Sequence, residues 1–409
     1  MASVRDPVAR SALECSDSGR RTPGRGCVAR RERMMRSGKV LLLGAALLLA
    51  ACGTTQPARP PRYRIIAYVR GRADIPRISA QKLTHVNYAF GVVDNTGEVH
   101  LRTADSLRHL RQLEALKTKN PHLKVILSVG GWGADNFSDA ALTDASRRRF
   151  AASAIRFVTS YDLDGIDLDW EYPGQRGPGI KFRPEDKQNF TLLLKDIRER
   201  LDVASDEQHR TGGDRYTLSI ASAAGRYFDH TEMDRLHVYL DWINVMTYDF
   251  FGSHSQTTGH HTALYGGGSL HGKPLPSAAA FVEQHLAAGI PPEKIVVGIA
   301  FYGRGWTGVT ADANGLHQPY AGWTVNYSYS TIERSLIGQQ GFTRYWDRAA
   351  HAPYLWSPSL GVMISYEDPQ SVREKARFVK RHRLGGVMYW EHSHDPAEVL
   401  LDVLYRNLR

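Results

Sequence analysis

The feature that most constrains the fold is a series of eight short apolar runs, separated from one another by polar or helix-like stretches. The runs are rich in β-branched residues and continuously apolar, which is typical of parallel strands that are covered on both faces. They comprise residues 64–69, 84–90, 123–130, 163–170, 216–223, 241–249, 294–302 and 385–391. Between several of them the apolar residues recur at three- and four-residue spacing, as in 145–161, 187–203, 277–289 and 371–383.

This alternation predicts an α/β fold, and eight strand-helix units favour a closed (β/α)8 TIM barrel. An open, doubly wound sheet is the alternative. Such a sheet would carry a Gly-rich phosphate turn early in the chain. The sequence has no such turn, which favours the barrel.

Residues 303–365 do not continue the alternation of strand-like and helix-like stretches. They form a Tyr- and Trp-rich interval with several Gly turns. Its length argues against one structureless loop. We therefore expect a small α+β insertion domain at 303–365, between barrel segments 63–302 and 366–409. Active sites of TIM barrels lie at the C-terminal ends of the strands, so this domain would wall one side of the site.

The N-terminus has the pattern of an export signal. Residues 34–52 show a short basic start, an apolar stretch and small residues before Cys52. The ending LAAC resembles the lipobox of bacterial lipoproteins, which implies lipidation of Cys52 and anchoring in a bacterial membrane, with Gly53 favouring the outer membrane. The alternative is a plain secretory signal and a secreted or periplasmic product. We assign residues 1–51 to an upstream extension and signal peptide, and 52–62 to a Pro-rich tether.

The net charge of +10 does not indicate a nucleic-acid partner. Residues 1–51 contain ten Lys or Arg and four acids, so the remainder carries only +4. The three cysteines are Cys15, Cys27 and Cys52, and a mature chain starting at Cys52 has no pair to oxidise.

The fourth run contains acids where a buried strand normally has apolar residues. In LDGIDLDWE, side chains alternate between faces, so Asp167, Asp169 and Glu171 share one face. The opposite face carries Ile166, Leu168 and Trp170. Crowded carboxyl groups away from water shift their pKa values, which is a mark of functional sites. Asp164 lies three residues before Asp167, so its side chain points to the opposite face of the strand. We expect a structural role for it at the start of the strand.

Aromatic and polar residues gather at the ends of the other runs. They are Tyr68, Phe90, Gly131, Trp132, Met246, Tyr248, Asp249, Tyr302, Arg304 and Trp390. Aromatic faces stack on the apolar faces of sugar rings, while carboxylates and Tyr hydroxyls bind ring edges. This set therefore predicts a sugar-binding cleft.

The motifs resemble glycoside hydrolase family 18, the chitinases and their relatives. DGIDLDWE (164–171) matches the DxxDxDxE signature of the family. SVGGW (128–132), MTYD (246–249), FYGRGW (301–306) and GGVMYW (385–390) look like its other strand motifs, in the same order. Residues 348–371 are similar to the end of the insertion domain of deep-cleft members.

The resemblance implies a retaining chitinase that cleaves β-1,4 links in chitin or chitooligosaccharides, with the substrate's own 2-acetamido group as nucleophile. Glu171 would protonate the leaving oxygen, and Asp169 would orient the acetamido group with help from Asp167 and Tyr248. Asp249 and Arg304 would contact sugar groups, and Trp390 would form the floor. No cofactor or metal is implied, and we expect a monomer.

Several alternatives remain open. Three alternating acids could bind Ca²⁺ or Mg²⁺, and His254, His260, His261, His392 and His394 invite a zinc interpretation. The enzyme could instead act on peptidoglycan or N-glycan cores, or the chain could be a non-catalytic chitin-binding lipoprotein. Where many deep-cleft relatives carry a Trp after the MTYD motif, this chain has His254, and its last strand ends in WEHSHD. These departures put the outer sugar subsites in doubt.

Overall fold

The computed structural model describes residues 63–323 and 326–409. The predicted signal peptide, the lipidation site Cys52 and the tether lie outside the described residues. Within the described ranges, none of the helices has both the length and the apolar character needed to cross a membrane.

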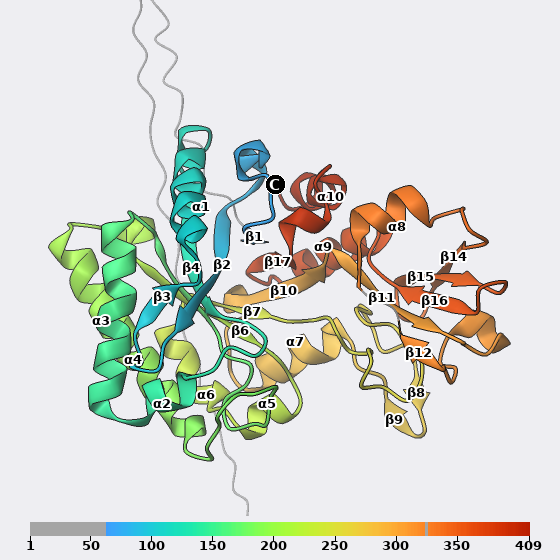
Figure 1. The fold of residues 1–409 in the computed structure, drawn as a ribbon, viewed down its shortest axis with the longest axis horizontal. Coiled ribbons are helices and arrows are strands. Elements are labelled where there is room, and N and C mark those ends of the chain that lie inside the picture. Colours follow the sequence, from blue (N-terminus) through green and yellow to red (C-terminus); the bar gives the residue numbers. More distant parts are fainter. Residues whose placement is uncertain (1–62, 324–325) are drawn as a thin grey trace, which may run out of the picture. The chain divides into compact units, whose positions relative to one another are not determined.

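Eight parallel strands close into a barrel, which confirms the predicted (β/α)8 TIM fold (Figure 1). Each barrel strand pairs with the next one in the chain, and β1 pairs with both β2 and β17, so the ring is complete. The strands are β1 (Arg64–Val69), β2 (His85–Val93), β4 (Lys124–Gly130), β5 (Gly165–Asp169), β6 (Thr217–Ser222), β7 (Trp242–Val245), β10 (Ile295–Ala300) and β17 (Gly386–Trp390). All eight lie within the predicted apolar runs or overlap them.

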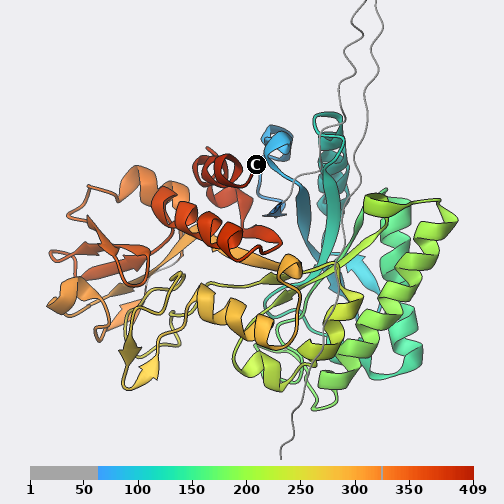
Figure 2. The ribbon, with the colours of Figure 1, turned by 180° about the vertical axis from the view of Figure 1, so that it is seen from behind.

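Helices cover the outside of the barrel and bury its apolar residues (Figures 1 and 2). On β5, for example, Ile166 and Leu168 are fully buried in the main core together with Phe190 of α4. The helices are α1 (Ala104–Ala115), α2 (Phe137–Leu142), α3 (Asp144–Ser160), α4 (Asp186–Glu207), α5 (Arg226–Asp229), α6 (Met233–Leu236), α7 (Ala278–Ala287), α8 (Tyr329–Ser335), α9 (Pro369–Arg381) and α10 (Val399–Leu408). The four helices predicted at 145–161, 187–203, 277–289 and 371–383 correspond to α3, α4, α7 and α9.

Side chains at the helix starts explain where two of these helices begin. The Thr143 hydroxyl accepts a hydrogen bond from the backbone N–H of Ser146 at the start of α3. Asp368 does the same for two N–H groups of α9, whose first residue is Pro369. Such caps satisfy N–H groups that have no partner within the helix, and proline fits the first helical position because its missing N–H is not needed there.

A second, antiparallel sheet follows the barrel strand β10. It comprises β11 (Tyr302–Thr307), β12 (Gly322–Trp323), β13 (Tyr327–Ser328), β14 (Thr343–Asp347), β15 (Ala352–Ser357) and β16 (Val362–Ser365). With α8 it occupies the interval that the sequence marks as different, and it has apolar clusters of its own. The assignment of residues 303–365 to a separate domain stays a prediction.

Two small elements lie outside the predicted pattern. The short strand β3 (Val99–Leu101) pairs antiparallel with β2, and a hairpin of β8 (Ser269–Leu270) and β9 (Lys273–Pro274) precedes α7. Both are too short to produce a recognisable alternation in the sequence.

Candidate active site

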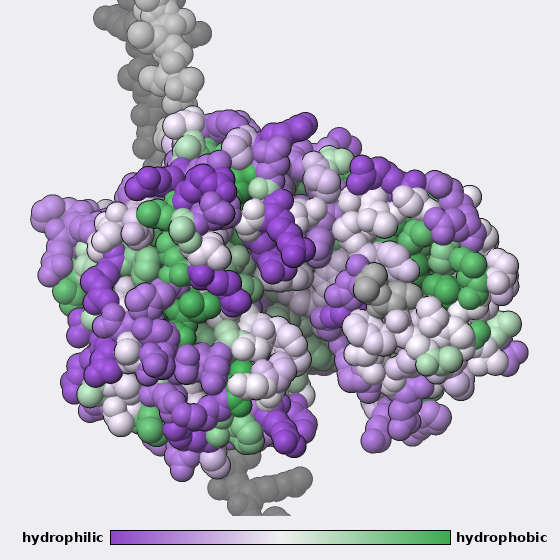
Figure 3. All heavy atoms as spheres, viewed as in Figure 1, coloured by the Kyte–Doolittle hydropathy of each residue, from purple (hydrophilic) through white to green (hydrophobic). Residues whose placement is uncertain are grey.

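The three alternating acids of the fourth run lie at the C-terminal end of β5. Asp167 and Asp169 are in the strand, and Glu171 follows two residues after its end. Asp169 and Glu171 line a cavity of about 700 Å³, where Figure 3 shows the surface to be hollowed. Other walls come from β2, from the segments after β4, β6 and β7, from β17 and from the second sheet. The acids therefore reach one concave site, as the barrel topology requires.

Asp167 is fully buried beneath this cavity and is held by four donors. The hydroxyls of Ser219, Ser128 and Tyr68 donate to its carboxylate at 2.6, 2.7 and 2.8 Å, and the Asn244 amide donates at 3.1 Å. Burial raises the pKa of Asp167, and these hydrogen bonds oppose that rise. The four donors come from β1, β4, β6 and β7, so the carboxylate links these four barrel strands to its own strand, β5.

Asp169 has a different environment. It is 5% exposed, and its Oδ1 has no hydrogen-bond partner among the described residues. Burial, followed by the charges of Glu171 and Asp167, raises the pKa of Asp169 well above its ordinary value. A buried carboxyl oxygen without a partner is costly unless a ligand satisfies it. Asp169 is thus placed to bind a hydrogen-bond donor that enters the cavity.

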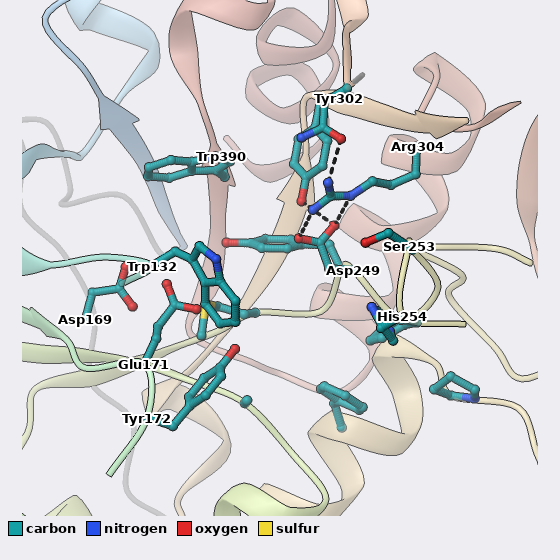
Figure 4. Close-up of a pocket in the computed structure, with 18 of the residues that line it drawn as sticks. Trp132, Asp169, Glu171, Tyr172, Asp249, Ser253, His254, Tyr302, Arg304 and Trp390 are labelled. Atoms are coloured by element: carbon teal, nitrogen blue, oxygen red, sulfur yellow. Dashed lines mark hydrogen bonds and ion pairs between the residues drawn. The ribbon is translucent and has the colours of Figure 1, made fainter. Parts of the chain in front are cut away.

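Glu171 projects into the same cavity beside Asp169 and Tyr172 (Figure 4). Burial raises the pKa of Glu171 to about 7; a hydrogen bond from Tyr172 opposes this rise, and the negative charge of Asp249 adds to it. A carboxyl group with such a pKa is protonated for part of the time at neutral pH. It can therefore donate a proton and later accept one.

The opposite wall of the cavity carries a charged pair. Asp249, just beyond β7, accepts hydrogen bonds from Arg304 Nε at 2.8 Å and Arg304 Nη2 at 2.6 Å, and from the Tyr302 hydroxyl at 2.8 Å (Figure 4). His261 Nδ1 lies 3.5 Å from the same carboxylate. Burial alone would raise the pKa of Asp249, but His261 and Arg304 hold it below its ordinary range. This carboxylate therefore stays ionised.

Tyr248 and Met246 line the cavity from the segment that follows β7. The Tyr248 hydroxyl makes only a long contact, 3.9 Å, with the sulfur of Met388. Burial and nearby carboxylates raise the pKa of Tyr248 well above its ordinary value, so the hydroxyl keeps its proton and can donate it in a hydrogen bond.

Aromatic rings form the remaining surfaces. Trp390 at the end of β17 stacks on Phe90 of β2, with ring centres 5.5 Å apart, and Tyr68 packs against Trp390 at 5.7 Å. Trp132 and Trp323 also line the cavity and are unusually exposed, at 67% and 53%. Such exposed rings are suited to stacking on the faces of a ligand.

The structure brings most of the predicted binding residues to this cavity. It is lined by Phe90, Trp132, Asp169, Glu171, Met246, Tyr248, Asp249, Tyr302, Arg304 and Trp390. Tyr68 and Asp167 lie behind it and act through their hydrogen bonds. Gly131 contributes through its backbone: its N–H donates to Asp169 O at 2.9 Å, and a Cβ at this position, whose φ is +91°, would lie 2.5 Å from the Phe90 ring.

Asp164 lies apart from the cavity, as its parity predicts. It accepts a hydrogen bond from Val125 N at 2.8 Å and pairs with Lys117 at 2.7 Å. Among the described residues, no group of three or more His, Cys, Asp or Glu is arranged so that it could hold a metal ion.

Several residues of the site were not singled out from the sequence as its parts. Tyr172, Trp323 and Asn326 line the cavity, and Ser219 and Asn244 hold Asp167. The last two could have been found, because each is a polar residue on the inward face of an otherwise apolar strand. Trp323 and Asn326 lie within residues 303–365, where the apolar residues follow neither the helical nor the strand spacing. No sequence pattern therefore predicts the orientation of these two side chains.

Comparison with known families agrees with this geometry. The family model described as glycosyl hydrolases family 18 matches residues 64–395, which span the barrel and the second sheet. The chain belongs to glycosyl hydrolase family 18.

Several known proteins are similar to this chain over most of its length. Chitinase A1 of Niallia circulans is 42% identical over 73% of this chain, and the chain spans only 44% of the length of that relative. A family 18 N-acetylglucosaminidase of Paenibacillus barengoltzii, whose structure is solved, is 42% identical, with a TM-score of 0.78 over 85% of this chain and all of that one. Chitinase ChiW of Paenibacillus sp. str. FPU-7 is 38% identical, with a TM-score of 0.78 over 85% of this chain and 32% of that one.

Proposed function

We propose that this family 18 member is a chitinase, which hydrolyses β-1,4 links between N-acetylglucosamine units with retention of configuration. The observation that carries the proposal is the placement of Asp169, Glu171 and Tyr248 around one cavity with Trp390 at its wall. The similar proteins include several named chitinases, and the solved structure of one of them superposes on this chain with a TM-score of 0.78.

The roles follow from the environment of each group. Asp169, whose Oδ1 has no protein partner, accepts the N–H of the substrate's acetamido group, and Tyr248 donates to the acetamido carbonyl. The carbonyl oxygen then attacks the anomeric carbon. The positive charge of the oxazolinium ion that forms favours the ionised form of Asp169, and this carboxylate stabilises the ion in turn. Asp167, held by four donors, supports Asp169 from below.

Glu171 handles the proton in both half-reactions. In its protonated form it gives a proton to the leaving glycosidic oxygen as the bond to the anomeric carbon breaks. In its ionised form it accepts a proton from the water that opens the oxazolinium ring, which returns the enzyme to its starting state. A pKa of about 7 serves both steps. The reaction on this chain needs no cofactor.

A second candidate is release of single N-acetylglucosamine units from chain ends. The similarity to the solved N-acetylglucosaminidase, which is covered over its whole length, favours it. The product profile from one long chitooligosaccharide distinguishes the two activities: an endo-acting chitinase yields mixed internal fragments from the start, while the exo-acting enzyme yields the monosaccharide throughout.

The test of the main proposal is incubation of chitooligosaccharides with the wild type and with Glu171→Gln. We expect turnover by the wild type, and binding with little turnover by the variant. A wild type that binds chitooligosaccharides without cleaving them would contradict the proposal and favour a chitin-binding lipoprotein. Cellooligosaccharides, which lack the acetamido group, are the matched substrate control: equal cleavage of both would refute the substrate-assisted mechanism.

The anchoring of the enzyme is also part of the proposal. The lipobox-like ending at Cys52 supports a lipoprotein held in the outer membrane by Cys52 and a Pro-rich tether, acting as a monomer. Inhibition of lipoprotein signal peptidase should leave an unprocessed precursor in the membrane. A product that is unchanged and soluble in the periplasm would contradict the anchor, and light scattering of the mature domain tests the monomer.

A further inference from the structure

Two exposed arginines follow the first barrel strand, and the first of them, Arg70, lies beside the Trp390 ring at the edge of the cavity. Arg70 and Arg72 follow β1, which is the neighbour of β17 in the barrel. The guanidinium carbon of Arg70 lies 5.9 Å from the centre of the Trp390 ring. Both arginines are exposed, and neither pairs with a carboxylate in residues 63–323 or 326–409.

The backbone that carries them is held in place. A Cβ at Gly71, between the two arginines, would lie 2.5 Å from His109 Cε1, so only glycine lets this turn pack against the histidine. His109 is nearly buried, and its Nδ1 lies 3.0 Å from the Tyr88 hydroxyl. The turn is closed by a hydrogen bond from Ala73 N to Arg70 O at 3.0 Å. The arginines thus extend from a fixed support and not from a loose loop.

The other polar groups near this end of the cleft are His394 and the buried carboxyl group of Glu391, which forms no ion pair with Arg70 or Arg72. His394 lines the cavity, with its Nε2 3.3 Å from Glu391. Glu391 is 1% exposed and also accepts hydrogen bonds from the N–H and hydroxyl of Ser393. Burial lowers the pKa of His394, although Glu391 opposes the shift; Arg70 and Arg72 lower it further, so His394 is neutral near pH 7. The exposed positive charge at this end of the cleft therefore belongs to the two guanidinium groups.

Arg304, on the opposite wall of the cavity, differs from Arg70 and Arg72 because it forms an ion pair. Its guanidinium is matched by both oxygens of Asp249 and has a partner before any ligand binds. Within residues 63–323 and 326–409, the guanidinium groups of Arg70 and Arg72 donate no hydrogen bond. Planar guanidinium groups match carboxylates in a bidentate manner.

We propose that Arg70 and Arg72 select substrates in which an amino sugar at or next to Trp390 carries a carboxylate, such as the lactyl group of N-acetylmuramic acid. The inference rests on the proposed function, since it uses the same cleft and the same acetamido chemistry. It adds acidic glycans of the peptidoglycan type as preferred substrates beside neutral chitooligosaccharides. The bond cleaved remains one whose anomeric carbon belongs to a 2-acetamido sugar.

The test compares three tetrasaccharides: (GlcNAc)4, the alternating N-acetylglucosamine–N-acetylmuramic acid tetramer, and that same tetramer with its carboxylates converted to methyl esters. We expect the wild type to prefer the acid over its ester in kcat/KM, and Arg70→Gln/Arg72→Gln to reduce this preference about tenfold, which corresponds to roughly 1.4 kcal/mol. Raising the salt from 0.05 to 0.5 M should weaken the preference of the wild type, because both arginines are exposed.

Two control variants separate charge from structure. Arg111→Gln/Arg148→Gln removes two exposed arginines from α1 and α3, outside the cleft, and should leave the acid-to-ester ratio of the wild type unchanged. Arg70→Lys/Arg72→Lys keeps both charges and should retain part of the preference. Equal losses on all three substrates with the Gln pair would show that the arginines only support Trp390, and would overturn the inference.

A wild type without acid-to-ester preference would also overturn it. Failure of the proposed function gives a different result, namely no turnover of any of the three sugars. In that case calorimetric titration of the wild type with the acid and the ester still measures the preference in binding.

Discussion

The cleft contains two carboxylate regions with opposite electrostatics. On β5 and just after it, in what we call the β5 region, burial raises the pKa values of Asp167, Asp169 and Glu171. On the opposite wall, His261 and Arg304 hold the pKa of Asp249 below its ordinary range. Both regions place acids in one cavity, but only the first contains groups that can change protonation near neutral pH.

The difference shows that the groups around a carboxyl side chain determine whether it keeps a fixed charge or exchanges a proton. A cation within hydrogen-bond distance fixes a carboxylate as a permanent charge, whereas burial without a cation leaves it ready to exchange a proton. The Asp249 region is thus suited to hold the shape of the cleft, and its negative charge helps to raise the pKa of Glu171. The β5 region is suited to the chemistry. The four predictions below test this division, beginning with the largest expected effect.

Asp169→Asn should cause the largest loss. The substitution removes the charge opposite the developing oxazolinium ion, and we expect kcat to fall about 10²- to 10³-fold, the range for loss of one preorganised electrostatic partner. Steady-state kinetics on a chitooligosaccharide measures it. Asp249→Asn is the matched control; an equal loss of kcat in both variants would break the proposed division between the two regions.

Tyr248→Phe removes the hydroxyl that we expect to donate to the acetamido carbonyl. Because this hydroxyl has only a long contact with Met388 in the protein, its loss leaves no strong internal hydrogen bond broken. We expect kcat/KM to fall about tenfold, as for one hydrogen bond of roughly 1.4 kcal/mol. An unchanged kcat/KM would remove Tyr248 from the mechanism.

The pH dependence of kcat/KM should report Glu171. The acid must be protonated to donate, so activity should decline as pH rises through about 7, the pKa of Glu171. The charge of Asp249 contributes to raising that pKa, so Asp249→Asn should move the alkaline limb to lower pH. A limb that stays in place in this variant would show that the two regions are electrically independent.

The smallest effect is expected from Ser219→Ala. Asp167 loses one of its four donors but keeps Ser128, Tyr68 and Asn244, so the free energy of unfolding should fall by about 1 kcal/mol. Denaturant unfolding measures the change, with kcat altered only a few-fold. A loss of kcat as large as that of Asp169→Asn would mean that Asp167 needs every donor to orient its neighbour.

The sequence predicts the barrel well because the information there is periodic. Continuous apolar runs such as 294–302, which are short and rich in β-branched residues, are typical of buried strands. The alternation in 163–171 places the three acids on one face. Closure of the ring follows from the number of units. The short β3 was missed since three residues show no period.

The cleft is predicted less completely, for a physical reason. His261 was considered only as a zinc ligand, whereas it lies buried behind Asp249, more than ten residues along the chain. Trp323 and Asn326 come from the second sheet, whose short antiparallel strands bring together residues that no local pattern connects. The partner of Arg304 was likewise not evident, because a long side chain can pair with any acid within several ångströms.

The unpartnered Oδ1 of Asp169 has a consequence for inhibitor chemistry. A compound that presents an N–H to this oxygen and a carbonyl to Tyr248 would satisfy groups that the fold leaves unsatisfied. A cationic ring above Trp390 would add attraction to the acids of β5. Compounds that bear only hydroxyl groups at these positions would match the site less well, so selectivity against glucose-mimicking inhibitors would be a property of the scaffold itself.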